Sequence, residues 1–329
     1  MRECIICKGS LQSSSIPVCP KCAKERWEVA ETLHEGLELI GRGDCGVCSN
    51  MCGIEKEGLC RIRYREGGII RSRSSRNRAL LHAYFDPLPT NCCNSWFCRG
   101  SRMRGFNLAV FYYGCNFDCL YCQNWSHKNV GVASSVGIDE LLSHALRRDV
   151  KCICHFGGSP EPQIGFALNF SRKVLEKRED IMICWEWNGA GKKEFALRAA
   201  ELSHTSNGTV KFDLKAWNEN LHRILTGRSN KPVLRNFSAI FDRFPEVISA
   251  TTLLVPYYVD EEEVERIAEF IASHDTSIPY SLLVFHPDYR LTDLPVTPKE
   301  QVFECYKKAK KHLKNVSIGN LHLLGGVLM

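Results

Sequence analysis

Short apolar runs alternate with amphipathic segments from Gly105 to the end of the chain. The apolar runs are rich in Val, Ile, Phe and Tyr, a composition typical of buried parallel strands. They begin at Leu108, Lys151, Ile181, Thr209, Val247 and Tyr280. Helical spacing of apolar residues marks the segments between them, such as 138–148, 192–204 and 261–273. The alternation predicts an α/β fold.

Six βα units in about 200 residues predict a partial (β/α)6 barrel, shorter than the ~250 residues of a full eight-fold barrel. An open doubly wound sheet would show the same alternation, so periodicity alone does not decide between the two. A further strand from Val316 is expected to extend the sheet.

The first 104 residues do not follow this pattern. Residues 1–44 contain four cysteines and a helix-like run from Ala23 to Ile40. Residues 45–104 are rich in Cys, Arg and Gly, and Pro87 and Pro89 are expected to break any regular element there. We therefore predict three regions: 1–44, 45–104 and a barrel over 105–329.

Cysteine is the unusual feature of the composition, with 18 residues in a chain of 329. The start, MRECIICKGS, has no apolar core of a signal peptide, and no run approaches the ~18 apolar residues of a membrane helix. Close C-x2-C and C-x3-C pairs suit metals better than disulfides. The composition predicts a cytoplasmic metalloprotein of a reducing or anaerobic cell. The net charge of +6 permits an acidic partner without indicating nucleic acid.

A C-x3-C-x2-C loop, Cys115, Cys119 and Cys122, directly follows the first predicted strand. Thiolates are the usual ligands of iron–sulfur clusters, and a [4Fe–4S] cluster takes four. Three thiolates therefore leave one iron open to bind a substrate. Part of a zinc site, or three unligated cysteines, are the alternatives. The position of the loop and Tyr121 before the last cysteine favour a cluster.

Polar residues follow the other predicted strands, where a barrel places its active site. Gly157 and Gly158 would let backbone groups approach a ligand closely. Each polar residue alone could cap a helix or form hydrogen bonds within a loop. Because several of them are expected at the same rim of the barrel, together they predict a binding site. The polar residues are Glu186, Asn188, Asp213, Lys215 and His286.

These motifs resemble the radical S-adenosylmethionine superfamily, and within it the pyruvate formate-lyase activating enzyme group. The resemblance implies that Cys115, Cys119 and Cys122 hold a [4Fe–4S] cluster whose open iron binds S-adenosylmethionine. It also implies a set of cofactor-binding residues: Tyr121, the glycines Gly157 and Gly158, Glu186 and Asn188 of an ETNG-like motif, Asp213 and Lys215 of an aspartate–lysine motif, and His286. The family pattern usually has an acidic residue after the glycines, where this chain has Ser159, and Glu161 is not assumed to replace it.

The activity implied by the resemblance is reductive cleavage of S-adenosylmethionine. A low-potential donor such as ferredoxin or flavodoxin would supply the electron, and a 5′-deoxyadenosyl radical would abstract hydrogen from a substrate. The expected function is that of an activating-enzyme-like oxidoreductase acting on a partner protein. Modification of RNA or of a small metabolite is an alternative, motivated by a predicted N-terminal zinc module and by the arginine-rich stretch 61–78. A non-enzymatic zinc scaffold is a third hypothesis.

Two further cysteine groups have metal-ligand spacing. Two C-x2-C knuckles fit a tetrahedral zinc site that would stabilise a small module: Cys4, Cys7, Cys19 and Cys22. A second group resembles the cysteine-rich leader of the AmmeMemoRadiSam subgroup, as do a CQNW run at 122–125 and the ending at 319–324. It could bind zinc or an auxiliary cluster: Cys45, Cys48, Cys52 and Cys60. No role is assigned to Cys92, Cys93 and Cys98.

Overall fold

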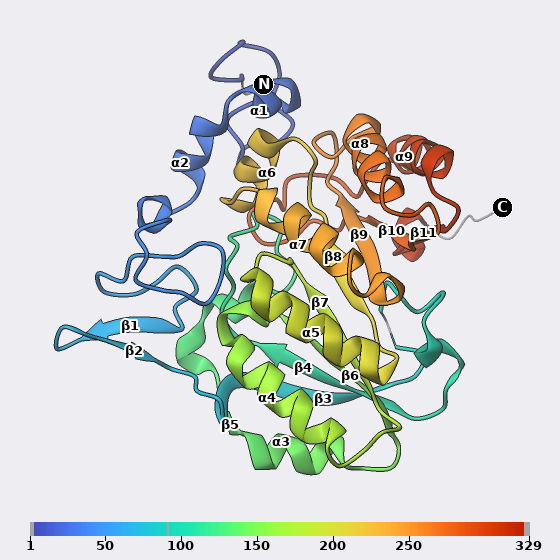
Figure 1. Cartoon of the computed structure of the whole chain (residues 1–329). Helices are drawn as coiled ribbons and strands as arrows, with labels where there is room; N and C mark the ends of the chain where they lie inside the picture. The colour runs from blue at the N-terminus through green and yellow to red at the C-terminus, as the bar shows by residue number, and fades with distance from the viewer. Residues whose placement is uncertain (1–2, 91, 326–329) are drawn as a thin grey trace.

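A nine-stranded sheet forms the centre of this computed structural model, which describes residues 3–90 and 92–325 (Figure 1). The strand order is β11-β10-β9-β8-β7-β6-β4-β3-β5. The outer parts of the predicted regions 1–44 and 105–329, residues 1–2 and 326–329, lie outside the described residues.

Seven neighbouring strands of this sheet run parallel. They are β4 (Phe106–Tyr112), β6 (Val150–Gly157), β7 (Met182–Trp187), β8 (Val210–Asp213), β9 (Ile248–Leu254), β10 (Tyr280–Val284) and β11 (Val316–Gly319). All six predicted strands and the predicted extension are therefore present. Because β11 and β5 are opposite edges of one sheet, the parallel strands form an incomplete barrel. The predicted α/β fold class is confirmed.

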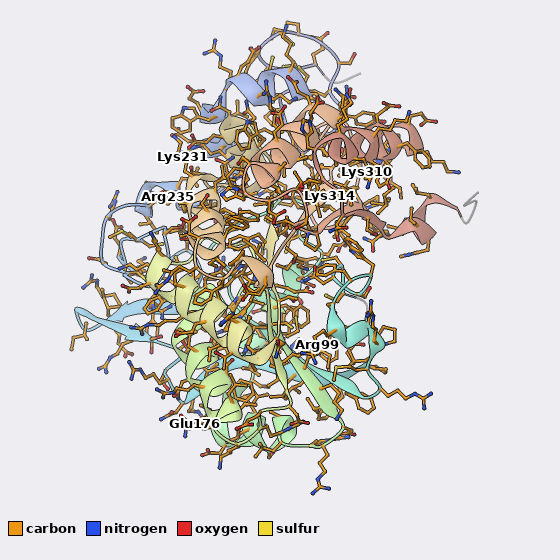
Figure 2. All side chains as sticks on the ribbon, turned by 45° about the vertical axis from the view of Figure 1, so that its right-hand side comes forward. Arg99, Glu176, Lys231, Arg235, Lys310 and Lys314 are labelled. Atoms are coloured by element: carbon orange, nitrogen blue, oxygen red, sulfur yellow. The ribbon has the colours of Figure 1, made fainter. Side chains whose placement is uncertain are left out.

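Helices connect the parallel strands and cover the outer face of the sheet (Figure 1). They are α3 (Ile138–Ala145), α4 (Ile164–Leu175), α5 (Lys193–Ser206), α6 (Glu219–Thr226), α7 (Lys231–Phe241), α8 (Glu261–Ala272) and α9 (Lys299–His312). Side chains cap the amino ends of α6 and α8, since Asn218 accepts a hydrogen bond from Leu221 N and Asp260 accepts one from Glu263 N. Charged residues on the outer helices, such as Arg235 and Lys310, are exposed (Figure 2).

The helix-like run from Ala23 to Ile40 is four short pieces rather than one helix. They are α1 (Pro20–Glu25), η1 (Trp27–Val29), α2 (Ala30–Leu33) and η2 (Leu37–Leu39). The backbone leaves helical geometry at Arg26, with φ −131°, and at Gly36, with a left-handed φ of 72°. Apolar spacing is therefore retained while the helical hydrogen bonding is interrupted.

The segment 45–104, expected to be irregular, contains three strands. A hairpin is formed by β1 (Arg63–Glu66) and β2 (Ile69–Ser72), and β3 (Arg78–Pro87) pairs antiparallel with β4 and with β5 (Ser135–Gly137). Pro87 is the last residue of β3, where a missing N–H disturbs the ladder least. The expectation of an irregular segment was therefore wrong for residues 63–87, whereas β3 does end at Pro87.

The remaining short 3₁₀ turns are η3 (Arg99–Arg102), η4 (Trp125–Lys128), η5 (Val130–Val132), η6 (Glu161–Gln163), η7 (Pro245–Val247) and η8 (Leu321–Leu324). None of the helices in residues 3–90 and 92–325 has the length and apolar composition needed to cross a bilayer.

Candidate active site

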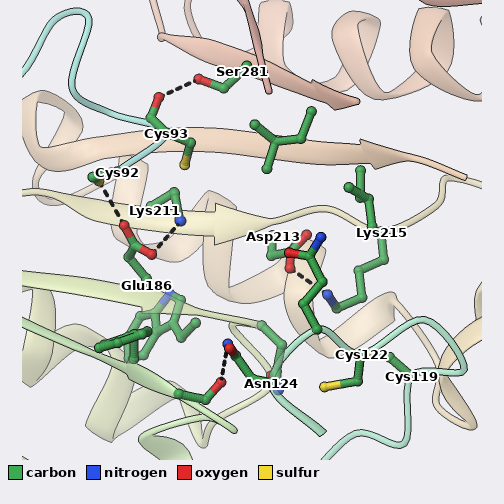
Figure 3. Close-up of a pocket in the computed structure, with 18 of the residues that line it drawn as sticks. Cys92, Cys93, Cys119, Cys122, Asn124, Glu186, Lys211, Asp213, Lys215 and Ser281 are labelled. Carbon is green, nitrogen blue, oxygen red and sulfur yellow. Dashed lines mark hydrogen bonds and ion pairs between the residues drawn. The ribbon is translucent and has the colours of Figure 1, made fainter. Parts of the chain in front are cut away.

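A cavity of about 530 Å³ lies inside the incomplete barrel (Figure 3). The cysteine loop after β4 and residues of β6, β7, β8, β10 and β11 contribute to its wall. The lining includes ten predicted residues: Cys115, Cys119, Cys122, Tyr121, Gly157, Gly158, Glu186, Asn188, Asp213 and Lys215. Side chains that sequence reasoning placed on one rim therefore share one cavity.

His286 is the predicted residue that the structure does not bring to this cavity. Its side chain is 52% exposed, and Nδ1 lies 3.2 Å from Asp288 Oδ2. β10 ends two residues earlier, at Val284, and the buried Phe285 donates its N–H to Thr297 Oγ1 at 2.8 Å. The chain therefore turns away from the cavity before it reaches His286.

Neighbouring elements hold the cysteine loop in place. Asp118 N donates to Thr226 O at 2.9 Å, and Leu120 N donates to Leu225 O at 3.0 Å, so the end of α6 supports the loop. The Asp118 carboxylate accepts from His34 Nδ1 at 2.8 Å and pairs with Lys128. Burial would raise the pKa of Asp118, but these two partners hold it well below its usual range. The loop is thus fixed from both sides.

The spacing of the loop thiols suits a cluster better than one metal ion. Among the described residues, the ligand atoms of Cys4, Cys7, Cys19 and Cys22 lie within 4.8 Å of one another, but the sulfur atoms of Cys115, Cys119 and Cys122 form no such group. A tetrahedral zinc ion with Zn–S bonds of about 2.3 Å holds its sulfur atoms about 3.8 Å apart. The open arrangement therefore fits a larger group, such as a [4Fe–4S] cluster.

Buried polar atoms without partners also point to a ligand. Tyr121 Oη, His127 Nδ1 and Trp187 Nε1 have no hydrogen-bond partner within the described structure, and all three residues line the cavity. An unpaired buried polar atom costs about 1–3 kcal/mol. A polar ligand in the cavity would satisfy these atoms. His127 Nε2 lies 3.6 Å from Cys122 Sγ, and burial lowers the pKa of His127 to about 4, so the ring is neutral near pH 7.

Charged side chains of β8 and the segment that follows it lie next to the cysteine loop. Lys215 pairs with Asp213, and its Nζ lies 5.5 Å from the centre of the Tyr121 ring. Burial alone would lower the pKa of Lys215, but Asp213 and the neighbouring Cys119 raise it overall. Asn188 donates to Asn116 Oδ1 at 2.7 Å and lies 3.7 Å from Cys115 Sγ. One cation, one anion and one amide therefore border the thiols.

The two glycines at the end of β6 are required by the chain itself. Gly157 has φ +113°, and a Cβ there would lie 2.6 Å from Tyr112 N; a Cβ on Gly158 would collide with Gly114 O, at the start of the cysteine loop. Glu161 is buried outside the cavity lining, where it accepts from Gly189 N at 2.9 Å and from Ser159 Oγ. Glu161 therefore joins two loops and does not supply an acidic group to the cavity.

Sequence reasoning missed part of the cavity. Lys211 lies two residues before Asp213 on β8, and strand periodicity could have placed both on one face. Cys92 and Cys93 also line the cavity, yet they belong to a loop with no periodic signal. Asn124 donates to Gly157 O at 3.1 Å, which connects the CQNW run to the end of β6.

The other predicted metal ligands form two separate groups. Cys7 Sγ and Cys19 Sγ lie 3.6 Å apart, and the four thiols of that group are close enough to share one ion. Cys45, Cys48, Cys52 and Cys60 line one small cavity together with Asn116. Within residues 3–90 and 92–325, these four thiols do not form a group within 4.8 Å.

The polar cavity of this incomplete α/β barrel includes the carboxyl ends of its parallel strands, where barrel enzymes have their active sites. The chain belongs to the radical SAM superfamily, whose sequence model matches residues 109–271. A Methanocaldococcus jannaschii protein with the provisional name of a glycyl-radical enzyme activating enzyme is 30% identical over 217 residues, which cover 64% of this chain and 79% of the relative. Membership implies a [4Fe–4S] cluster and S-adenosylmethionine as cofactors.

Two more distant similarities were also found. The pyruvate formate-lyase 1-activating enzyme of Escherichia coli is 23% identical over 188 residues, which cover 55% of this chain and 75% of the relative. A crystal structure of Streptococcus suis SuiB bound to the precursor peptide SuiA has 14% identity and a TM-score of 0.49, covering 64% of this chain and 48% of that chain. A similarity at that level supports no conclusion about function.

Proposed function

We propose that this radical SAM enzyme holds its cluster through Cys115, Cys119 and Cys122 and acts on a protein partner. The observation behind the first part is the shared cavity, in which three thiols lie beside unpaired buried polar atoms and a Lys–Asp pair. A cluster held by these three thiols would supply the electron for reductive cleavage of S-adenosylmethionine, and so the means to abstract hydrogen from a substrate.

The chain's own residues would bind and orient the cofactor. S-adenosylmethionine has a carboxylate, an amino group and a sulfonium, so Lys215 and Asp213 offer opposite charges to complementary groups. Tyr121 Oη and His127 Nδ1 offer polar atoms that have no partner among residues 3–90 and 92–325. Apolar side chains in the same lining would exclude water from a reactive radical: Phe117, Phe156, Leu253, Leu283 and Ile318.

The edge of the sheet supports a polypeptide as substrate. β11 is the edge strand of the nine-stranded sheet, and residues 317–320 line the cavity. Edge strands offer backbone donors and acceptors to an extended peptide, which can add as a further strand. A partner segment bound in this way would place its side chains at the cavity wall. The names of the relatives as activating enzymes agree with a protein substrate.

The two further cysteine groups are proposed as separate metal sites. The close thiols of Cys4, Cys7, Cys19 and Cys22 fit one structural zinc ion, because four thiolates leave no open position. The group of Cys45, Cys48, Cys52 and Cys60 is proposed to bind zinc or an auxiliary cluster, because its four thiols line one small cavity.

Anaerobic reconstitution tests the cluster assignment. With a strong reductant and S-adenosylmethionine, we expect the wild-type protein to form 5′-deoxyadenosine. Cys119→Ala should reduce the iron bound per chain and abolish 5′-deoxyadenosine. Cys305→Ala is the matched control, because this thiol is buried in α9 and does not line the cavity. Full iron and full cleavage in Cys119→Ala would refute the assignment.

The protein-substrate part needs its own experiment. A candidate partner protein labelled with deuterium should transfer the label into 5′-deoxyadenosine, as measured by mass spectrometry. Transfer from a labelled RNA or metabolite, with none from any protein tested, would contradict the proposal while leaving the cluster assignment intact.

A further inference from the structure

Three metal-ligating groups meet at the end of the cavity away from Cys119 and Cys122 (Figure 3). Cys92 Sγ, Cys93 Sγ and a carboxylate oxygen of Glu186 all lie within 4.8 Å of one another. Cys92 Sγ is 2.8 Å from Glu186 Oε1. Neither cysteine belongs to the three cysteine groups discussed above, so this is a separate cluster of side chains.

The loop that contains Cys92 and Cys93 is fixed against the amino ends of the barrel strands. Ser281 Oγ, in the second residue of β10, donates to Cys93 O at 2.8 Å. Asn94 donates to Thr209 Oγ1 at 3.2 Å and accepts from Ser249 Oγ at 3.2 Å. These bonds reach the starts of β8, β9 and β10. The segment 92–98 therefore forms the floor of the cavity, which it lines through Cys92, Cys93, Ser95 and Trp96.

A lysine balances the charge at this floor. Lys211 is buried, and its Nζ lies 2.8 Å from Glu186 Oε2. Two thiolates and one carboxylate would carry a charge of −3, which a divalent cation and the Lys211 ammonium together neutralise. With both cysteines protonated, the Lys211–Glu186 pair is also neutral. Exchange of two thiol protons for one divalent cation therefore leaves the net charge of this buried site unchanged.

We propose that Cys92, Cys93 and Glu186 bind a thiophilic divalent cation of the Zn²⁺ class at the floor of the cavity. Binding breaks two S–H bonds, forms two metal–thiolate bonds and releases two protons to solvent. Bond lengths of about 2.3 Å to sulfur and 2.0–2.2 Å to oxygen place tetrahedral ligand atoms about 3.5–3.8 Å apart, and the three ligand atoms here lie within 4.8 Å of one another. The 2.8 Å contact of Cys92 with Glu186 would lengthen on binding.

Three protein ligands leave one coordination position open toward the cavity. Zinc sites with three protein ligands and an open position are the catalytic kind, whereas four-ligand sites are structural. A substrate held between the cysteine loop and the floor could donate an oxygen, nitrogen or sulfur atom to that position. The ion would then fix the end of the substrate away from the cluster loop.

Zinc content measures this site without any radical chemistry, so its outcome is independent of the proposed function. Full-length wild-type protein and Cys92→Ser/Cys93→Ser are purified anaerobically and dialysed, and zinc and iron are counted by mass spectrometry. We expect the double variant to lose one equivalent of zinc per chain with its iron unchanged. Cys154→Ser/Cys184→Ser is the matched control, because these thiols border the same floor but lie outside the group of three.

A second variant distinguishes loss of a zinc ligand from misfolding of residues 92–98. Glu186→Gln keeps the shape of the side chain and should weaken zinc binding at this site at least tenfold in a competition with a chelator. Equal zinc in the wild type and in Cys92→Ser/Cys93→Ser overturns the proposal, as does loss of iron in place of zinc. A Cys92–Cys93 disulfide in the anaerobic wild-type protein, shown by peptide mass, also overturns it.

Discussion

A single buried carboxyl, that of Glu161, is expected to make stability depend on pH. Burial raises its pKa from 4.5 to about 7 in the folded protein. A raised folded-state pKa means that the stabilising contribution is fully present below about pH 4.5 and is lost as pH rises through about 7. The shift corresponds to about 3 kcal/mol between these limits.

Glu161→Gln removes this titration while its amide oxygen can still accept from Gly189 N. Between pH 5 and pH 8 we expect the free energy of unfolding of the wild type to fall relative to that of the variant, by up to about 3 kcal/mol. Denaturant titration of both proteins in the same buffers measures the difference, in which the other titrating groups cancel. Parallel pH profiles would show that Glu161 titrates normally.

Some single residues of the cavity could be placed from the sequence, and others could not. Asp213 and Lys215 follow a strand whose apolar pattern was clear, so their position at the cavity followed from the end of the strand. His286 follows a similar strand, but the burial of Phe285 turns the chain away, and no local pattern signals that turn. A strand end thus predicts which residues are near a site, whereas the direction of each side chain depends on tertiary packing.

At the scale of elements, the junction of β6 with the cysteine loop depends on Gly158. An added Cβ would collide with Gly114 O, which belongs to backbone and cannot move independently of the loop. Gly158→Ala should therefore displace the loop and lower the iron bound after reconstitution to well below half of the wild-type amount. Gly165→Ala is the control: its Cβ meets nothing within 4 Å, so it should retain iron and gain about 0.5–1 kcal/mol of stability. Full iron in Gly158→Ala would mean that the loop tolerates the shift.

The N-terminal elements are expected to depend on zinc for their order. α1 contacts the barrel through Lys24 Nζ, 2.9 Å from Asp260 Oδ2, and Tyr258 Oη donates to Val18 O at 3.1 Å. Apolar residues of the module, such as Val18, Ala23 and Leu33, also pack into the main core. Helices of four to six residues are too short to be stable alone, so removal of a metal ligand should loosen the segment around the four cysteines. In Cys22→Ser we expect rapid proteolysis within residues 3–44 and a protected barrel fragment. Resistance equal to that of the wild type would show that the module folds without metal.

Elements of the first 104 residues were the hardest to predict from sequence. Apolar spacing indicated one helix over 23–40, but spacing does not report a left-handed residue such as Gly36. β3 was missed because prolines suggested a break, and its pairing with β4 is a long-range contact that a local window cannot detect. The parallel strands were predictable because they are buried on both faces and read as continuous apolar runs.

At the scale of the whole molecule, the floor of the barrel is built by a segment far away in sequence. Asn94 is separated from Ser249 by 155 residues, and no repeat or spacing in residues 92–98 signals that contact. The sequence therefore indicated the wall of the cavity and not its closure. An incomplete barrel without such a floor would be open at both ends, so this segment closes one end of the cavity.

Asn94 is expected to be the residue on which this closure depends. Asn94→Ala leaves the hydroxyls of Thr209 and Ser249 without this partner inside the barrel, which should cost about 1–3 kcal/mol. Hydrogen exchange of residues 92–98 should become faster, while the outer helices keep their wild-type protection. Ser95→Ala is the control in the same loop, since its side chain lines the cavity but makes no hydrogen bond within the described structure. If hydrogen exchange of residues 92–98 is unchanged in Asn94→Ala, the prediction is wrong. Other contacts then hold this segment, chiefly the 2.9 Å hydrogen bond from Trp96 Nε1 to Ser281 Oγ.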